Sequence, residues 1–286
     1  MKEGVKIICE AIKANNAIKF NNSIISKFKP REMKWREYDS SMNDFACTFF
    51  ECLPKEYTKD LVDKYNNKDV KDIREKSTVF KKYIEETLSK TKNHDLVALE
   101  LGGTGSKVFS EFKKGFFKKT LGVCLNDIRS PVYESMDLKR GHSVIMGDIL
   151  KTGNDDVYSK IIKKFQGEKV DLIISRMMGP LCYYRNSPII MENIIRKIFS
   201  ILNENGIVFF QIYYIKDHEF NKKTHYEIDK FINTYLYNKN MKNVKIWAER
   251  IKKHFPMIEV QVSKGVVRIH KGIGAPQELP RVATLS

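Results

Sequence analysis

From residue 96 onward, short apolar runs alternate with longer stretches in which apolar residues recur every three or four positions. The first pattern is typical of strands buried on both faces of a sheet, and the second of amphipathic helices. Strands that alternate with helices are joined by crossovers, which predicts a mostly parallel sheet with helices on both faces. The apolar runs are residues 96–101, 120–125, 143–146, 170–175 and 206–214, and the helical stretches are 107–114, 131–140, 155–165 and 188–202.

The order changes near the C-terminal end. A further helical stretch lies near residues 224–237, and residues 243–255 favour a helix although their pattern is ambiguous. Residues 258–271 predict two strands joined by a tight turn at 263–265. The fold class expected is therefore α/β, with a Rossmann-like, seven-stranded, mostly parallel sheet that ends in an antiparallel hairpin. Residues 272–286 are rich in Pro and Gly and are expected to form a flexible tail.

Residues 1–93 read as a helical N-terminal region that acts as a lid or binds the substrate. Apolar residues recur at helical spacing in 61–76 and 77–90, and Ser77 is a candidate cap for the second of these helices. The polar stretch 89–95 joins this region to the core. The predicted organisation is a helical region over 1–93, a core over 94–271 and a tail over 272–286.

Composition limits the compartment and the partners. No run of about 18 apolar residues occurs, so no membrane span is expected. The five cysteines form no CxxC pair, which disfavours a zinc site and a disulfide framework and suits an intracellular, cytoplasmic protein. The formal net charge is +16, which attracts polyanions and makes a nucleic acid a candidate partner. Compositional drift explains the same charge equally well.

The sharpest motif is a glycine-rich segment, Gly102, Gly103 and Gly105, placed directly after an apolar strand and before a helix. Glycines are needed where the backbone turns tightly and approaches a ligand closely. A P-loop would need Gly-Lys-Ser, but the order here is Gly105-Ser106-Lys107. A dinucleotide-binding loop would need a third glycine where Val108 stands.

Glu100 ends the strand that precedes these glycines, where an acidic side chain would disfavour a phosphate. This set of residues, with four further segments in order, resembles class I S-adenosylmethionine-dependent methyltransferases from residue 96 to about residue 271. The further segments are 121–131, 143–150, 170–181 and 202–212. The glycine motif is one residue shorter than the family pattern, and the spacing from Glu100 to Asp127 is longer.

The resemblance implies S-adenosyl-L-methionine as the cofactor and assigns its contacts. Glu100 and the glycines Gly102, Gly103 and Gly105 would hold its amino-acid part, and Asp127 its ribose hydroxyls. Asp148 would contact the adenine amino group, Ile149 would pack on the adenine, and Ser175 and Arg176 would lie at the reactive end. Taken singly, Asp127 and Asp148 are more typical of turns and helix caps, and only the ordered set of segments favours the cofactor contacts.

The sequence leaves the methyl acceptor open. Arg176, Tyr183 and His218 are catalytic candidates by position alone, and no spacing of histidines or cysteines suggests a metal. The segment 170–181 lacks the motifs of enzymes that methylate exocyclic nitrogens or cytosine C5. Net charge favours RNA slightly over a small molecule or a protein. The alternatives are a non-catalytic binding or scaffold protein of the same fold, and an NAD(P)-binding protein.

Overall fold

The computed structural model describes residues 39–66, 70–90, 95–124, 127, 129–149, 156–176, 188–211, 238–263 and 266–280. The predicted helical stretch 224–237 and the turn residues 264 and 265 lie outside these ranges. Within the described residues, no helix is long and apolar enough to cross a membrane.

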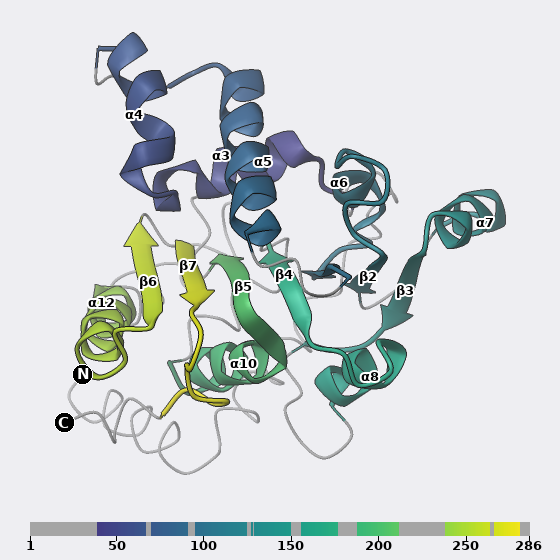
Figure 1. The fold of residues 1–286 in the computed structure, drawn as a ribbon. Coiled ribbons are helices and arrows are strands. Elements are labelled where there is room, and N and C mark those ends of the chain that lie inside the picture. Colours follow the sequence, from purple (N-terminus) through teal and green to yellow (C-terminus); the bar gives the residue numbers. More distant parts are fainter. Residues whose placement is uncertain are drawn as a thin grey trace, which may run out of the picture.

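Seven strands form one sheet in the order β3-β2-β1-β4-β5-β7-β6 (Figure 1). Strand β7 pairs antiparallel with β5 and β6, whereas the other pairs are parallel. This confirms the predicted mostly parallel sheet with a terminal antiparallel hairpin. The strands are β1 Val97–Leu101, β2 Lys119–Cys124, β3 His142–Met146, β4 Val170–Ser175, β5 Leu202–Gln211, β6 Ile258–Ser263 and β7 Val266–Lys271.

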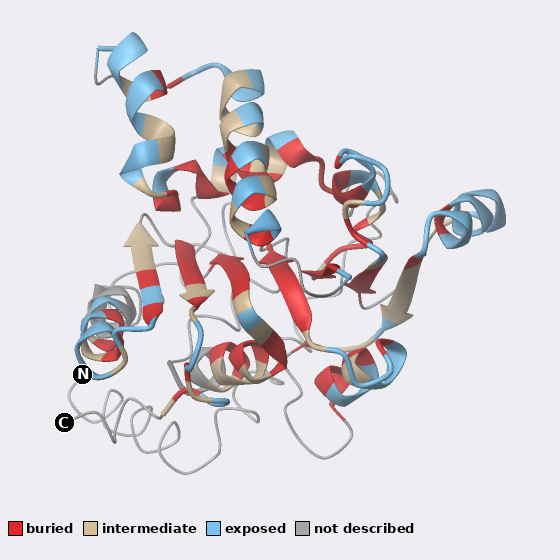
Figure 2. Ribbon diagram, in the orientation of Figure 1, coloured by how far each residue is buried: buried red, intermediate tan, exposed pale blue. Residues whose placement is uncertain are grey.

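One face of the sheet is covered by α8 (Val157–Lys164), α10 (Pro188–Ile201) and α12 (Asn238–His254). Helix α12 confirms the helix favoured for residues 243–255. Alternate strand residues such as Leu99 and Leu101 join these helices in one apolar cluster. Burial of both faces explains why the strands read as continuous apolar runs, and Figure 2 shows the central strands buried.

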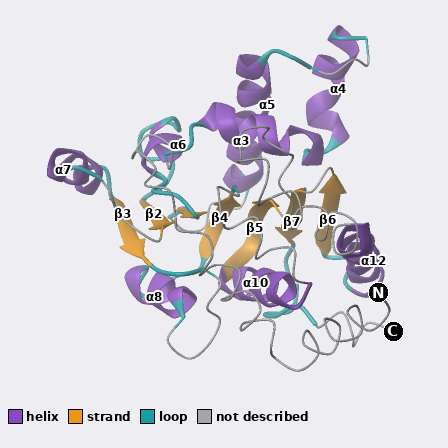
Figure 3. Ribbon diagram, turned by 180° about the vertical axis from the view of Figure 1, so that it is seen from behind, coloured by secondary structure: helices purple, strands orange, loops and turns teal. Residues whose placement is uncertain are grey.

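The other face is covered by helices that precede the sheet in sequence. These are α3 (Met42–Phe49), the 3-10 helix Phe50–Cys52, α4 (Lys55–Lys64) and α5 (Ile73–Ser89). Figure 3 shows α3 and α5 over this face, opposite α8 and α10. Aromatic rings join them to β5, because Phe49 and Phe80 lie with ring centroids 5.5 and 4.8 Å from that of Phe209.

The helices of the N-terminal region differ from the predicted pattern in one place. Residues 61–76 do not form one helix, since α4 ends at Lys64 and α5 begins at Ile73. The cap of α5 is Asp72, whose side chain accepts hydrogen bonds from two amides of the first turn. Ser77, the predicted cap, lies inside α5 and donates to the Ile73 carbonyl at 2.9 Å. The prediction of a Ser77 cap is therefore wrong.

The start of the predicted tail has a defined position. Leu279 is fully buried in the core cluster that includes α10, and Arg196 Nε donates to its carbonyl at 2.7 Å. Ala275 is buried in the same cluster. A flexible tail from residue 272 is thus wrong for residues 272–280, because two apolar side chains pack on the domain; residues 281–286 lie outside the described ranges.

The two helices that follow β1 and β2 are unusual. Helix α6 covers only Ser106–Ser110, although residues 107–114 read as helical. Helix α7 (Pro131–Lys139) extends away from the sheet beyond β3, and most of its surface is exposed (Figures 1 and 2). Val132 and Leu138 on α7 are 68% and 59% exposed. The short helix α6 therefore occupies the place of the longer helix that residues 107–114 predicted.

Candidate functional site

The glycine loop folds back over its neighbouring strand. Gly102 and Gly105 have φ values of 95° and 72°, which a side chain would strain. The Gly102 amide donates to the Val123 carbonyl at 2.8 Å, and Gly103 forms an antiparallel bridge to Val123. A Cβ on Gly122 would lie 1.9 Å from the Thr104 carbonyl oxygen. The loop therefore lies directly on β2, and glycines on both sides permit the approach.

Glu100 is buried beneath this loop with an incomplete set of partners. It is 2% exposed, and within the described part of the chain its Oε2 has no hydrogen-bond partner. The Gly105 amide donates to the carboxylate, and a Cβ on Gly103 would meet Oε1 at 2.3 Å. Burial, with the nearby Asp39, raises the pKa of Glu100 well above its usual value of 4.5. A cation placed against Oε2 would relieve this cost.

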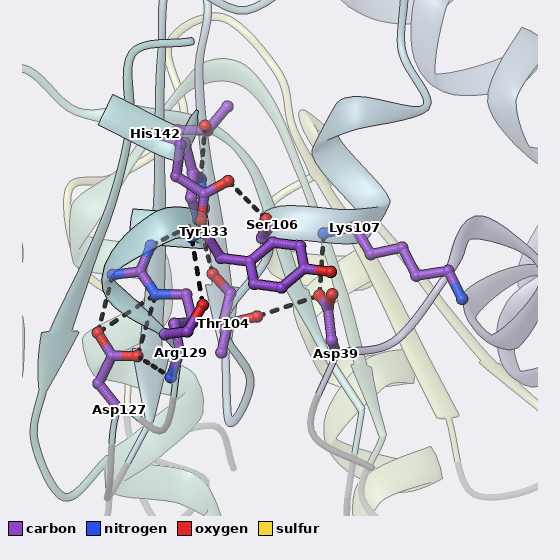
Figure 4. Close-up of polar contacts among 11 residues, drawn as sticks. Asp39, Thr104, Ser106, Lys107, Asp127, Arg129, Tyr133 and His142 are labelled. Atoms are coloured by element: carbon purple, nitrogen blue, oxygen red, sulfur yellow. Dashed lines mark hydrogen bonds and ion pairs between the residues drawn. The ribbon is translucent and has the colours of Figure 1, made fainter. Parts of the chain in front are cut away.

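Two more carboxylates from the N-terminal region lie near Glu100. Asp39 Oδ1 accepts hydrogen bonds from Thr104 Oγ1 at 3.1 Å and from the Lys107 amide at 2.9 Å (Figure 4). Burial raises the pKa of Asp39 even though Lys107 acts in the opposite direction. Asp44 pairs with Arg176 at 3.3 Å. Burial alone would raise the pKa of Asp44, but hydrogen bonds from Ser41 and the charge of Arg176 hold it below its usual range.

Asp127 is held by an arginine that also reaches a second carboxylate. Arg129 donates to both Asp127 oxygens, with Nη2 2.8 Å from Oδ2, and pairs with Asp137 at 2.7 Å (Figure 4). Asp137 also accepts from Ser106 Oγ at 2.6 Å, which ties α7 to α6. Burial acts to raise the pKa of Asp127, but the bonds from Arg129 outweigh it and keep the carboxyl ionised. Its side chain is 22% exposed and remains an acceptor.

His142 fixes the loop from below. Its Nε2 lies 2.8 Å from the Thr104 carbonyl and its Nδ1 2.8 Å from Thr120 Oγ1. Burial lowers the pKa of His142, so the neutral ring is favoured. Because a carbonyl only accepts, Nε2 carries the proton and Nδ1 accepts from the Thr120 hydroxyl.

The remaining predicted cofactor residues have structural contacts as well. Ser175 is fully buried, and its Oγ donates to the Leu101 carbonyl at 2.9 Å, which joins β4 to β1. Ile149 packs in the core, and its carbonyl accepts from Tyr158 at 2.9 Å. Asp148 is half-buried after β3. Their contacts with a cofactor stay predictions.

The catalytic candidates are only partly described. Arg176 directly follows β4 and pairs with Asp44, as above. Tyr183 and His218 lie outside the described residues. Within the residues the structure describes, no three His, Cys, Asp or Glu side chains are grouped as ligands for a metal ion.

Sequence reasoning gave no role to Asp39, Arg129, Asp137 or His142, although each fixes the glycine loop or a predicted ligand. Asp39 contacts Thr104 across 65 residues of sequence. No local pattern carries that contact. The one available signal was the proximity of Arg129 to Asp127, two residues apart.

The comparisons with known proteins are distant. No family model and no curated protein matches the sequence. Among solved structures, CalS10, an amino pentose methyltransferase from Micromonospora echinaspora, is 13% identical, with 50% of this chain and 52% of that chain covered and a TM-score of 0.30. The MycE methyltransferase of the mycinamycin biosynthetic pathway is 13% identical, with 82% and 54% covered and a TM-score of 0.40. The N-methyltransferase NodS from Bradyrhizobium japonicum is 15% identical, with 68% and 96% covered and a TM-score of 0.32.

The chain spans about half the length of the first of these structures. Because each TM-score is below 0.5, these likenesses add nothing to the fold assignment, which rests on strand order and strand direction. The sheet has the order β3-β2-β1-β4-β5-β7-β6, and its seven mostly parallel strands with β7 antiparallel to its neighbours are what the sequence resemblance implied. The chain has the fold of the class I S-adenosylmethionine-dependent methyltransferases.

Proposed function

We propose that the protein is an S-adenosylmethionine-dependent methyltransferase. The observation that carries this proposal is the buried Glu100 oxygen without a partner, in a group of carboxylates beside a glycine loop. Such a group suits the ammonium of an amino-acid ligand and disfavours the phosphates of NAD or NADP. The strand order supports the same proposal.

The residues present fit this cofactor. Glu100 and Asp39 would accept hydrogen bonds from its ammonium, and Gly102, Gly103 and Gly105 leave room for its backbone-like part. Asp127, held ionised by Arg129, would accept from the ribose hydroxyls. Asp148 would accept from the adenine amino group, with Ile149 and Ser175 completing the predicted contacts.

When bound, the cofactor supplies an electrophilic methyl group on a sulfonium. The chain contributes position and desolvation, since methyl transfer needs the nucleophile in line with the methyl carbon. Arg176 begins the segment after β4, where the reactive end is expected, and its pair with Asp44 sets its direction. Arg176, Tyr183 and His218 stay the candidates for contact with the acceptor. We favour RNA as that acceptor, because the net charge is +16.

Calorimetric titration with S-adenosylmethionine and S-adenosylhomocysteine, with NAD and NADP as controls, tests the proposal. Wild type should bind both sulfur compounds, and Asp127→Ala and Glu100→Gln should each lose about tenfold or more, the cost of an unmatched buried polar contact. Glu134→Gln, on the exposed surface of α7, is the matched control and should bind as wild type does. Binding of NAD but of neither sulfur compound would overturn the proposal.

The raised pKa of Glu100 adds a signature that a bystander carboxyl would lack. A cation bound at Oε2 lowers that pKa, so cofactor binding near neutral pH should release protons. Titration in two buffers of different ionisation enthalpy measures this release. The release should disappear in Glu100→Gln and persist in Glu134→Gln; an equal release in both variants would contradict the role of Glu100.

A further inference from the structure

A cavity of about 880 Å³ lies beside α6, the loop that follows it and the end of α7. Asp95 and Lys118, which precede β1 and β2, and His142, which begins β3, line it. It therefore lies toward the N-terminal ends of these strands. Glu100 and Asp127 lie at or after the C-terminal ends of β1 and β2. This cavity, called the basic groove below, is not lined by Glu100, Asp39 or Asp127, although Ser106, Asp137 and His142 belong both to its lining and to the network that holds the glycine loop.

The charges that line the basic groove do not balance. Five cationic side chains face two carboxylates. Both carboxylates are already paired, Asp95 with Lys118 and Asp137 with Arg129. This leaves an unbalanced set, and within the described part of the chain none of its members forms an ion pair. The set is Lys113, Lys114, Lys139 and Arg140, all exposed.

The groove is held open by packed aromatic rings. Phe117 lies edge-to-face against Phe112 and Phe109, with ring centroids 5.0 and 5.9 Å apart. These three side chains are buried beneath the cations and belong to the core cluster under α3 and α5. The four cations come from two segments that both line the groove, the loop after α6 and the end of α7. Mutual repulsion of such cations costs free energy that a bound polyanion removes.

We propose that the basic groove binds the phosphodiester backbone of a nucleic acid. Lys113 and Lys114 from the loop after α6, with Lys139 and Arg140 from the end of α7, contact its phosphates. The groove is larger than one phosphate needs, and four exposed cations match the repeated single charges of a backbone. Only the further step, that this nucleic acid is the methyl acceptor, rests on the proposed function.

Fluorescence anisotropy tests the groove on the full-length protein. The probes are a fluorescein-labelled single-stranded RNA of about 20 nucleotides and DNA of the same sequence, a length that spans an ordinary single-strand site. The groove variant carries Lys113→Ala, Lys114→Ala, Lys139→Ala and Arg140→Ala. The control variant removes the same charge from exposed surfaces of α8 and α12, through Lys160→Ala, Lys163→Ala, Lys164→Ala and Lys253→Ala.

Wild type and the control variant should bind within a few-fold of each other. The groove variant should lose about 100-fold at low salt, and the slope of log affinity against log salt should fall by about 3, since each lost phosphate contact contributes about 0.7 for single strands. A preference for the RNA probe would identify RNA as the source of the backbone. A preference for the DNA probe would identify DNA.

Three results would overturn the proposal. They are no binding of either probe by wild type, an equal loss of affinity in both variants, and binding of poly-glutamate in the groove that displaces neither nucleic-acid probe. Thermal unfolding confirms that each variant folds. Calorimetry with S-adenosylmethionine on the same variants separates the two proposals. If the groove variant loses affinity for the nucleic acid but still binds S-adenosylmethionine, the loss is assigned to the groove and not to the cofactor site. If nucleic acid binds but S-adenosylmethionine does not, the groove proposal holds and the proposed methyltransferase function fails.

Discussion

A buried carboxyl group with one oxygen that lacks a partner among the described residues, as in Glu100, destabilises the ligand-free protein when it ionises. Its raised folded pKa means that the native state keeps a proton that the unfolded state loses above about pH 4.5. Stability from this group is therefore present at low pH and is lost as pH rises toward the folded pKa. The same residue should thus weaken the fold and strengthen cofactor binding.

Glu100→Gln should consequently raise the free energy of unfolding, by about 1–3 kcal/mol near pH 8 and by less near pH 5. Urea unfolding of the ligand-free protein at the two pH values measures the difference. Glu134→Gln controls for loss of one negative charge at the surface. A stabilisation that is equal at both pH values would show that Glu100 does not titrate as proposed.

Lys271 is a second buried ionisable residue, and its side chain contacts the domain core and not the candidate cofactor site. Its Nζ donates to the Leu202 carbonyl at 3.1 Å, and it lies 4.5 Å from the centroid of the Phe199 ring. Burial, aided by Lys169, lowers its pKa from 10.5 to about 8. The native state therefore releases this proton before the unfolded state does, and stability from this group rises with pH between about 8 and 10.5.

Wild type should gain up to about 3 kcal/mol of stability relative to Lys271→Met as pH rises across that window. Denaturant unfolding of both proteins below and above a pH of about 8 checks this, because other titrating groups cancel in the difference. A difference that is independent of pH would show that Lys271 keeps its proton in the native state.

The residues of the candidate site divide by how far their partners lie along the chain. Glu100, Gly105 and Asp127 could be selected from the sequence because each lies near or after the end of a predicted strand, in a fixed order. Asp39 could not, because its contact with Thr104 depends on how the N-terminal helices pack on the sheet. Ile149 was selected for an adenine contact, which stays a prediction; the structure adds that its side chain packs in the core cluster. Sequence order gives position along a strand, and packing decides which face a side chain contacts.

Between elements, one arginine joins the N-terminal helices to the sheet. Arg268 of β7 is 1% exposed; its Nε donates to the Cys52 carbonyl at 2.7 Å and its Nη1 to the Tyr83 hydroxyl at 2.8 Å. It also pairs with Glu259, whose side chain is half exposed. The buried bonds, rather than this ion pair, should therefore carry most of its contribution to stability.

Arg268→Met should cost about 3 kcal/mol, because it removes hydrogen bonds to a buried carbonyl and to the buried Tyr83 hydroxyl and leaves a large side chain poorly matched, whereas Tyr83→Phe should cost about 1 kcal/mol. Chemical denaturation measures both. Hydrogen exchange should increase in α3 and α5 before it increases in β4. Equal costs for the two variants would indicate that the Tyr83 bond alone joins the elements.

The glycine loop and β2 form another such contact. Gly122→Ala would place a methyl group 1.9 Å from the Thr104 carbonyl, so loop and strand must separate. We expect a loss of about 1–3 kcal/mol in stability and a weakened cofactor affinity. Unfolding and calorimetry of Gly122→Ala, beside Ser143→Ala on β3, measure both. Unchanged cofactor affinity in Gly122→Ala would show that the loop position does not matter for binding.

The elements themselves were largely predictable. Buried strands such as β4 read as apolar runs, and amphipathic helices such as α10 show their periodicity, because each buries its own apolar residues. Helix α6 was overestimated: Val108 and Phe112 have helical spacing, but the helix ends at Ser110 and Phe112 packs in the core from the loop that follows. Helix α7 was found, but its direction away from the sheet was not, because direction depends on the Arg129 network.

At the scale of the whole molecule, the two faces of the sheet differ in how they are covered. Helices that follow the strands cover one face, and helices from the N-terminal region cover the face toward which Glu100 points. The N-terminal helices are therefore both part of the core and part of the candidate site, through Asp39 and Asp44. Their role as a lid stays a prediction. Their packing against β5 shows that they form a layer of the domain on one face of the sheet.

A core that contains a buried carboxyl group which a cationic ligand would stabilise links folding to the supply of that ligand. A ligand that binds only the native state stabilises it by about 2.7 kcal/mol at a hundred times its dissociation constant. The melting temperature of wild type, measured by differential scanning fluorimetry, should then rise with the concentration of S-adenosylmethionine. This rise should be much smaller in Glu100→Gln, and NAD should not change the melting temperature of either protein. In a cell, the lifetime of this chain against proteolysis would follow the abundance of its cofactor, so that scarcity removes the protein as well as its activity.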